Sequence, residues 1–398
     1  MVFFKQRASG DVIWQGDGAM LTRNALPVLG GRLSESFVRS YLASQHAQQQ
    51  LRESWWSANR PRVVDIFSYG GSRYDRTLRL RLEELSDVVS FFVVLEMGQS
   101  FARTGRRSSH AQPDAPRHRF NKSSPAFAPF ADRIVHVNLG SRSLITSADP
   151  KRNEQIMRTV GVELAYSKIP RPSPDHDAVL VSDIDEIPRA ESLRRLLDDE
   201  SVRTNLRSGH VYALTGPSYY YDIECRVQDG HPEARWNFGP RLVLARALIA
   251  TSWDQVRQHG PYRKPLPDHM HVHAVQRASW HFGWLMTLQE VRVKLCTNTD
   301  LIVRQACVSD KALETIRRAM AECKDPFGRP IPFVRVVARR GEIPDFALAN
   351  LDQFRAPMPA FVPTGRMATM SSNGRLRRGG TQLAITGQHG AQRDLAAQ

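Results

Sequence analysis

The chain has few cysteines and no long apolar run, and both features exclude classes of protein. It contains four cysteines among 398 residues. These are Cys225, Cys296, Cys307 and Cys323, which are too few and too scattered for a disulfide scaffold and form no C-x-x-C pair of a zinc knuckle. We therefore expect a reduced compartment. The longest nearly uncharged apolar stretch, residues 88–95, is far below the roughly 20 residues of a membrane span, so we expect no transmembrane segment.

The N-terminus shows no recognisable targeting signal. The apolar part of residues 1–7 is too short for a signal peptide, and no small-residue cleavage site follows it. From this we expect a cytoplasmic protein that is at most peripheral to a membrane.

Acidic residues are outnumbered by basic ones. Lys and Arg total 55 against 40 Asp and Glu, which gives a formal net charge of +15. Such a balance favours anionic partners, namely nucleic acid, anionic lipid or phosphorylated substrates. Much of the excess lies in residues 103–122 and 366–378, which have the composition of a loop and a tail. The charge therefore says little about the folded core.

Composition and periodicity divide the chain into three parts. Residues 1–61 form an accessory N-terminal extension, residues 62–356 a folded domain, and residues 357–398, rich in Pro, Gly, Ser and Arg, a disordered tail. Within the domain, β-branched and aromatic runs alternate with helical spacings, which predicts an α/β fold with a mostly parallel central sheet flanked by helices. We expect strands at 63–68, 88–96, 133–139, 178–182, 210–214, 218–224, 241–245 and 278–284, and helices at 78–85, 149–166, 188–197, 287–296 and 309–323.

The sharpest local signal is the acidic motif Asp183-Ile-Asp185-Glu186-Ile-Pro188, directly after the strand expected at 178–182. In an open α/β sheet, ligands bind at the carboxyl ends of the strands. Two carboxylates two residues apart project to one side of an extended backbone, and such oxygen ligands suit Mg²⁺ or Mn²⁺ completed by water and phosphate oxygens. We expect Asp183 and Asp185 to bind that ion and Pro188 to start the next helix. The alternative is that one aspartate only caps that helix.

A second motif is Trp280-His281-Phe-Gly-Trp284, with Lys294 on the helix expected after it. The two tryptophans can frame a sugar or base face, and His281 can be a third metal ligand or contact phosphate. Lys294 can reach a diphosphate. The alternative is an ordinary core strand with a satisfied histidine.

Three histidines alternate in His269-Met-His271-Val-His273. Spacing of two places their imidazoles on one face of a strand, so a zinc or iron site is conceivable. No carboxylate follows at a matching spacing, and we favour a polar strand face.

A tyrosine-rich segment, Ser218-Tyr-Tyr-Tyr-Asp222-Ile-Glu224, ends in two carboxylates. Tyrosines at this density suit a sugar-binding cleft or, more simply, a half-buried strand. On a strand Asp222 and Glu224 share one face, and either can act as a general base.

Taken in order along the chain, these motifs resemble glycosyltransferase family 17, whose best-known member is the β-1,4-mannosyl-glycoprotein 4-β-N-acetylglucosaminyltransferase. The resemblance covers residues 62–356, the whole expected domain. It is carried by the blocks at 65–68, 81–96, 177–188, 280–284 with Lys294, and 348–355.

The resemblance implies a GT-A-like fold and a transferase that inverts the anomeric carbon. The donor would be UDP-N-acetylglucosamine, the acceptor a glycan or glycoconjugate, and the cofactor Mn²⁺ or Mg²⁺ at Asp183 and Asp185. A carboxylate, Asp222 or Glu224, would deprotonate the acceptor hydroxyl. The residues expected to bind substrate are Glu96, Arg152, Asn153, Glu186, Trp280, His281 and Lys294.

Two departures from the family bear on the acceptor. The family usually has acidic residues where this chain has Tyr74, Arg76 and Arg79, and its familiar animal members have an N-terminal membrane anchor. A surface glycan of bacterial type or a small acceptor is therefore at least as well supported as an N-glycan. Residues 98–125, rich in Ser, Arg, His and Pro, are expected to form a lid or an acceptor-side loop, with a disordered insertion as the alternative.

Two other classes of protein compete with this reading. A nucleic-acid-binding protein would explain the net charge, but the chain has no helix-turn-helix, RRM or zinc-finger pattern, and its basic residues are not interleaved with aromatics. A metal-dependent phosphoesterase would use the same carboxylates.

Overall fold

The computed structural model describes residues 3–6, 12–15, 61–96, 120–139, 150–251, 253–258, 270–297, 310–325, 327 and 329–355. The chain divides into two units, Met1–Met358 and Pro359–Gln398. The second unit lies outside the described residues. So do most of the predicted N-terminal extension 1–61, the predicted tail 357–398 and residues 98–119 of the predicted lid, so these three assignments stay predictions.

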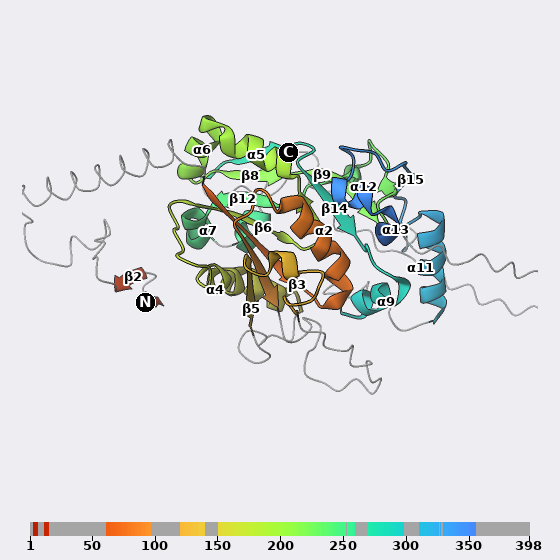
Figure 1. Cartoon of the computed structure of the whole chain (residues 1–398), viewed down its shortest axis with the longest axis horizontal. Coiled ribbons are helices and arrows are strands. Elements are labelled where there is room, and N and C mark those ends of the chain that lie inside the picture. Colours follow the sequence, from red (N-terminus) through yellow and green to blue (C-terminus); the bar gives the residue numbers. More distant parts are fainter. Residues whose placement is uncertain are drawn as a thin grey trace, which may run out of the picture. The chain divides into compact units, whose positions relative to one another are not determined.

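A seven-stranded sheet forms the centre of the first unit (Figure 1). Six of its strands run in the same direction, and only the strand β12 is antiparallel to both of its neighbours. The prediction of a mostly parallel sheet is thus confirmed. In spatial order the strands are β13 (Val272–Val275), β8 (Val211–Leu214), β12 (Arg241–Leu244), β6 (Asp177–Asp183), β3 (Arg62–Tyr69), β4 (Phe91–Glu96) and β5 (Ile134–Asn138).

Helices cover both faces of this sheet, because its central strands are apolar on both sides. Val63 and Phe67 of β3 pack into one core cluster, and Val64 and Ile66 into another. The first cluster includes residues of α2 (Asp75–Leu85), α5 (Ala190–Asp198) and α6 (Glu200–Arg207). The second includes residues of the π-turn Met157–Gly161, α4 (Val162–Tyr166), α7 (Ala245–Thr251) and α8 (Trp253–Gln258).

A second, smaller sheet is mixed, and only its strands β9 and β14 are parallel to each other. Its order is β15 (Phe333–Arg335), β10 (Cys225–Val227), β9 (Gly216–Tyr220), β14 (Ser279–Gly283) and β7 (Glu186–Pro188), with β11 (Arg235–Trp236) beside β9. The other described elements are β1 (Phe3–Gln6), paired with β2 (Val12–Gln15), the short helices Ser72–Tyr74, Ala128–Phe130 and Pro232–Ala234, and the helices α3 (Pro150–Ile156), α9 (Leu288–Thr297), α11 (Asp310–Glu322), α12 (Asp345–Ala349) and α13 (Leu351–Phe354).

Three local predictions were wrong, each at a turn or a boundary. Pro188 does not start a helix, because it ends β7, and α5 begins at Ala190. The strand predicted at 218–224 ends at Tyr220, since Tyr221 has a φ of 68°. The helix predicted at 149–166 is interrupted by the π-turn.

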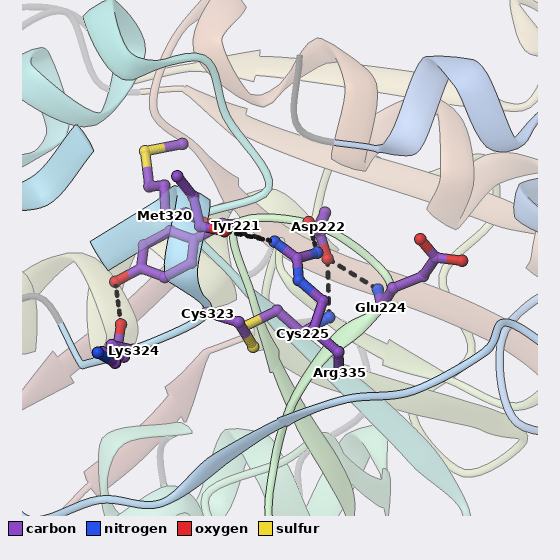
Figure 2. Close-up of a disulfide and its surroundings, with 9 residues drawn as sticks. Tyr221, Asp222, Glu224, Cys225, Met320, Cys323, Lys324 and Arg335 are labelled. Atoms are coloured by element: carbon purple, nitrogen blue, oxygen red, sulfur yellow. Dashed lines mark hydrogen bonds and ion pairs between the residues drawn. A yellow bond between two sulfur atoms is a disulfide. The ribbon is translucent and has the colours of Figure 1, made fainter. Parts of the chain in front are cut away.

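Four scattered cysteines did not predict a disulfide, but the structure contains one. Cys225 on β10 and Cys323, the residue after α11, form a disulfide across a sequence separation of 98 residues (Figure 2). Disulfides persist in oxidising compartments, so this bond argues against the reduced compartment expected from the cysteine count. Among the described residues, no helix is both long and apolar enough to cross a membrane.

Candidate functional site

The acidic motif forms the turn between the two sheets. Asp183 is the last residue of β6, and Glu186 is the first of β7. We call residues 183–186 the acidic turn. Asp183 lies opposite Ser68 of the neighbouring parallel strand β3. The turn therefore occupies the carboxyl edge of the large sheet, where the sequence predicted it.

Two arginines from other elements bind the first carboxylate of the turn. Arg257 on α8 donates from Nη2 to Asp183 Oδ2 at 2.7 Å. Arg158, in the π-turn, donates from Nη2 to both oxygens at 3.3 and 3.2 Å. Burial acts to raise the pKa of Asp183, but the two arginines outweigh it and hold that pKa at about 2. Asp183 is therefore an anion at every physiological pH.

Glu186 is fully buried and holds the turn closed. Its oxygens accept from Arg257 at 2.7 and 2.8 Å, from Trp236 Nε1 at 2.6 Å, and from the backbone N–H of Asp183 at 2.9 Å. Four donors from the protein itself satisfy this carboxylate. Its contacts give Glu186 the role of shaping the turn; the predicted contact with substrate is not among them.

Asp185 binds a different cation. Lys294 Nζ on α9 donates to Asp185 Oδ2 at 3.1 Å, and the two side chains are 15% and 12% exposed. Burial acts to lower the pKa of Lys294, but Tyr74 and Asp185 raise it above its ordinary value. Three cationic side chains, Arg158, Arg257 and Lys294, thus face the three carboxylates of the turn, and Arg158 also pairs with Glu154 at 2.7 Å.

A buried arginine donates hydrogen bonds to the backbone of the turn. Arg81 on α2 forms an ion pair with Asp65 on β3, with both side chains 0% exposed. Its Nη1 donates to the carbonyl oxygens of Asp183 and Glu186 at 3.2 and 2.8 Å, and its Nη2 to Ser182 Oγ at 2.6 Å. Three of the sequence blocks behind the family resemblance therefore meet in one hydrogen-bond network.

His281 lies against the same turn. It faces Glu186 across the antiparallel pair of β14 and β7. Its ring stacks on Trp236 with the centroids 3.8 Å apart, and its Nδ1 is buried without a hydrogen-bond partner. Burial lowers the pKa of His281 to about 4, so the imidazole is neutral at pH 7. Buried polar atoms usually have a hydrogen-bond partner, so this nitrogen is a candidate donor to a ligand.

The neighbouring tryptophans are both buried in apolar clusters. Trp280 and His281 point to opposite faces of β14, as successive strand residues do. Trp280 is 3% exposed, donates from Nε1 to the carbonyl of Glu342 and packs in an apolar cluster. Trp284 lies in another apolar cluster. These contacts favour the core-strand alternative for Trp280, and its contact with substrate stays a prediction.

The other predicted binding residues lie elsewhere on the first unit. Glu96, at the end of β4, accepts from the backbone N–H of Phe120 at 3.2 Å and contacts His136 Nε2 at 2.8 Å. Arg152 is exposed and Asn153 is buried on α3. The substrate contacts of these residues stay predictions. On this helical segment it is Arg158, not these two, that reaches Asp183.

Asp222 and Glu224 do not share a strand face, because they lie in the turn between β9 and β10 (Figure 2). Asp222 accepts from the backbone N–H groups of Glu224 and Cys225 at 2.8 and 2.7 Å and from Arg335 at 2.8 Å. Glu224 forms an ion pair with Arg355 at 2.9 Å, which lowers the pKa of Glu224. Both carboxylates therefore have structural partners in this turn.

The alternating histidines form no metal site in the part of the chain that the structure describes. His269 lies outside that part. His271 and His273 lie beside His210, with a hydrogen bond of 2.9 Å between His210 and His273. Among the described residues, no group of three or more His, Cys, Asp or Glu side chains is placed to hold a metal ion.

The acidic turn fits a divalent cation only together with a phosphate ligand. A magnesium or manganese ion at such a site takes one or two carboxylates and completes its shell with phosphate oxygens and water. Asp185, which pairs with Lys294 through Oδ2, and Nδ1 of His281 are the donors that remain for it. Both oxygens of Asp183 already face arginines.

The comparison with family models agrees with the family that the motifs suggest. The family model of glycosyltransferase family 17 matches residues 35–228, a span that includes the acidic turn and ends before His281 and Lys294. Over this span the chain is similar to that family. Among solved structures, the galactosyltransferase LgtC, in complex with donor and acceptor sugar analogues, aligns over 47% of this chain and 59% of its own, with 17% identity and a TM-score of 0.23. No curated protein matches the chain.

Sequence reasoning missed Arg81, Arg158 and Arg257 as parts of the site. Arg81 lies in a block that carries the family resemblance, so that block was a usable signal. No local pattern distinguishes Arg158 or Arg257 from other surface-type arginines, because their partner Asp183 is 25 and 74 residues away in the sequence.

Proposed function

We propose that the chain is a glycosyltransferase, which moves a sugar from a nucleoside-diphosphate donor to a hydroxyl group of a glycan acceptor. The observation that carries the proposal is the acidic turn at the carboxyl edge of a mostly parallel sheet, with cationic side chains gathered around it. The match to glycosyltransferase family 17 over residues 35–228 supports it. The resemblance adds UDP-N-acetylglucosamine as donor and inversion at the anomeric carbon.

The main chemical task at this turn is to stabilise the leaving group. When the sugar is transferred, negative charge develops on the departing nucleoside diphosphate, and cations aimed at that charge lower the barrier. Lys294 and Arg158 supply positive charge from this chain. A bound Mg²⁺ or Mn²⁺, held by Asp185 with Asp183 and His281 beside it, would add Lewis-acid stabilisation of the diphosphate.

The acceptor hydroxyl also needs a base for in-line attack. A carboxylate held by an arginine is a weak base, because the arginine lowers its pKa, as Arg355 does for Glu224. Asp222 already accepts from three donors. These contacts therefore give no support to Asp222 or Glu224 as the base. The proposal depends instead on how the site stabilises the leaving group.

A donor screen tests the proposal. The full chain is incubated with a panel of UDP- and GDP-sugars, with and without Mn²⁺, and release of nucleoside diphosphate is measured. We expect turnover of one donor, and a loss of about 100- to 1,000-fold in Asp185→Asn, as for other groups that stabilise transition-state charge. Asp229→Asn is the matched control, because Asp229 is 78% exposed and pairs only locally with Arg226.

Two results would contradict the proposal. Release of phosphate from simple esters, independent of any acceptor, would indicate a phosphoesterase that uses the same carboxylates. A salt-sensitive shift of DNA with no turnover of any donor would indicate a nucleic-acid-binding protein. Analysis of the anomeric product tests inversion separately.

A further inference from the structure

Trp236 on β11 lies beside the acidic turn and is only half-buried. Its Nε1 donates to Glu186 Oε1 at 2.6 Å, so the indole lies one hydrogen bond away from the turn. Three other tryptophans are at most 8% exposed and belong to the core, namely Trp253, Trp280 and Trp284. Core packing therefore does not explain the position of Trp236, and partly exposed tryptophans are frequent at binding surfaces.

The indole ring is held in one orientation by its neighbours. His281 stacks on one of its faces, with an angle of 11° between the two rings. In the pairing of β11 with β9, Trp236 lies opposite Gly216, where a Cβ would come within 1.7 Å of the carbonyl oxygen of Ser279. The backbones therefore meet here too closely for any side chain larger than that of glycine. A ring that is fixed before a ligand arrives loses little conformational entropy on binding.

The two residues that follow, Asn237 and Phe238, are also half-buried. The centroid of the Phe238 ring lies 5.5 Å from that of the indole. Arg241 holds this backbone, because it donates to the carbonyl oxygens of Asn237 and Gly239 at 2.9 and 2.7 Å. We call residues 236–238 the aromatic segment. It contains two apolar rings and an amide that can both donate and accept hydrogen bonds.

A sugar ring has the chemistry that matches this segment. One face of a pyranose carries C–H groups that pack on an aromatic ring, while the hydroxyl groups at its edge need hydrogen-bond partners. We propose that the aromatic segment binds the pyranose ring of a substrate, and that the ring packs on Trp236. This inference rests on the proposed function, in which the acidic turn faces the diphosphate. The donor sugar is joined to that diphosphate and the acceptor attacks the same carbon, so both sugars come close to the turn.

Three probes separate the sugar from the nucleotide in calorimetry of the full chain, with and without Mn²⁺. They are UDP, UDP-N-acetylglucosamine, and the methyl glycosides of N-acetylglucosamine, galactose and mannose with UDP present. Trp236→Leu removes the aromatic ring. It should weaken UDP-N-acetylglucosamine about tenfold if the donor sugar packs here, or a glycoside about tenfold if the acceptor does. UDP should bind within about twofold of the unaltered chain.

Two further variants show whether the ring itself is responsible. Trp236→Phe keeps an aromatic face but loses the hydrogen bond to Glu186, so it should weaken the sugar-bearing probe less than Trp236→Leu does. Phe346→Leu is the matched control, because Phe346 on α12 is another half-buried aromatic residue and lies outside the aromatic segment. It should change the binding of none of the probes. Circular dichroism checks that each variant is folded.

Hydroxyl-radical footprinting tests the same contact in the unaltered chain. Oxidation of Trp236, measured by mass spectrometry of its peptide, should fall when UDP-N-acetylglucosamine, or a glycoside together with UDP, is added. UDP alone should leave it unchanged. Should Trp236→Leu not fold, this measurement decides the question, since equal protection by UDP alone, or no protection by any sugar-bearing probe, overturns the inference.

The outcomes separate this inference from the function on which it rests. If UDP binds but Trp236→Leu weakens no sugar-bearing probe, or weakens UDP as much as UDP-N-acetylglucosamine, the inference is wrong and the transferase proposal stands. If the chain binds neither UDP nor any other nucleoside diphosphate or nucleotide sugar, the proposed function fails.

Discussion

Two turns of this protein use carboxylates and arginines in opposite ways. In the acidic turn, partners are shared: Arg257 binds both Asp183 and Glu186, and Asp183 binds both Arg257 and Arg158. In the turn at 221–225, each carboxylate has its own arginine, and Cys225, the first residue of the next strand, forms the disulfide. Residue type alone does not tell the two turns apart.

The difference lies in what each arrangement allows. Shared partners at the edge of a parallel sheet can be redistributed when an anionic ligand arrives, since Asp183, Arg158 and Arg257 each have a second group to pair with. Isolated pairs backed by a covalent bond have no such alternative and hold the chain in place. The candidate site therefore differs from the second turn in that its charged groups share ion-pair partners, and not in the number of charged groups.

The largest effect is expected for the arginine that supports the acidic turn. Arg81→Met leaves the buried carboxylate of Asp65 unpaired and should lower the free energy of unfolding by about 3–5 kcal/mol, measured by urea denaturation. Arg76→Met, on the same helix, is the control and should stay within about 0.5 kcal/mol. Equal effects of Arg81→Met and Arg76→Met would show that the hydrogen bonds and ion pair of Arg81 do not stabilise the fold. The double variant Arg81→Met with Asp65→Leu should recover much of the loss.

The disulfide should give the next largest effect. Replacing Cys225 and Cys323 together by serine opens a loop of 98 residues in the unfolded chain and should lower the free energy of unfolding by about 2–4 kcal/mol. Reducing agent should have a similar effect on the unaltered chain and little on the double variant. A reductant effect of equal size on both would mean that this bond is not what stabilises the second sheet.

A pH profile probes the neutral histidine beside the acidic turn. The pKa of His281 falls from 6.5 to about 4 on folding, so between these values the unfolded chain binds a proton that the folded chain does not. Stability should therefore fall as the pH drops from about 6.5 to 4, by up to about 3 kcal/mol. His281→Phe should remove this part of the profile, while His271→Gln, which removes an exposed histidine, should keep it. Identical slopes for the two variants would argue that His281 is protonated in the folded state.

The smallest effect is expected in the second turn. Arg335→Met should cost only about 1 kcal/mol, because the arginine is 45% exposed and Asp222 keeps its two backbone donors. The rate of transfer per folded molecule should not change. A large change in that rate, with stability intact, would return Asp222 to the role of general base and would remove the contrast between the two turns.

Much of the fold was predictable because its signals are local. The runs that became β3, β4 and β6 have apolar residues on both faces, which is typical of buried parallel strands, and the acidic motif follows one of them directly. The position of Asp183 and Asp185 at a sheet edge followed from that order alone. Errors arose where a turn replaced a strand, as at Asp222.

The sequence by itself thus determined the sheet, its carboxyl edge and the pair of aspartates at that edge, because these depend on patterns a few residues long. Only the tertiary structure decided which charges meet there. Arg158, Arg257 and Lys294 reach the turn from helices 25, 74 and 109 residues away from their partners. The disulfide joins residues 98 apart. Such contacts depend on how helices pack against both faces of the sheet, and no spacing within the sequence encodes that packing.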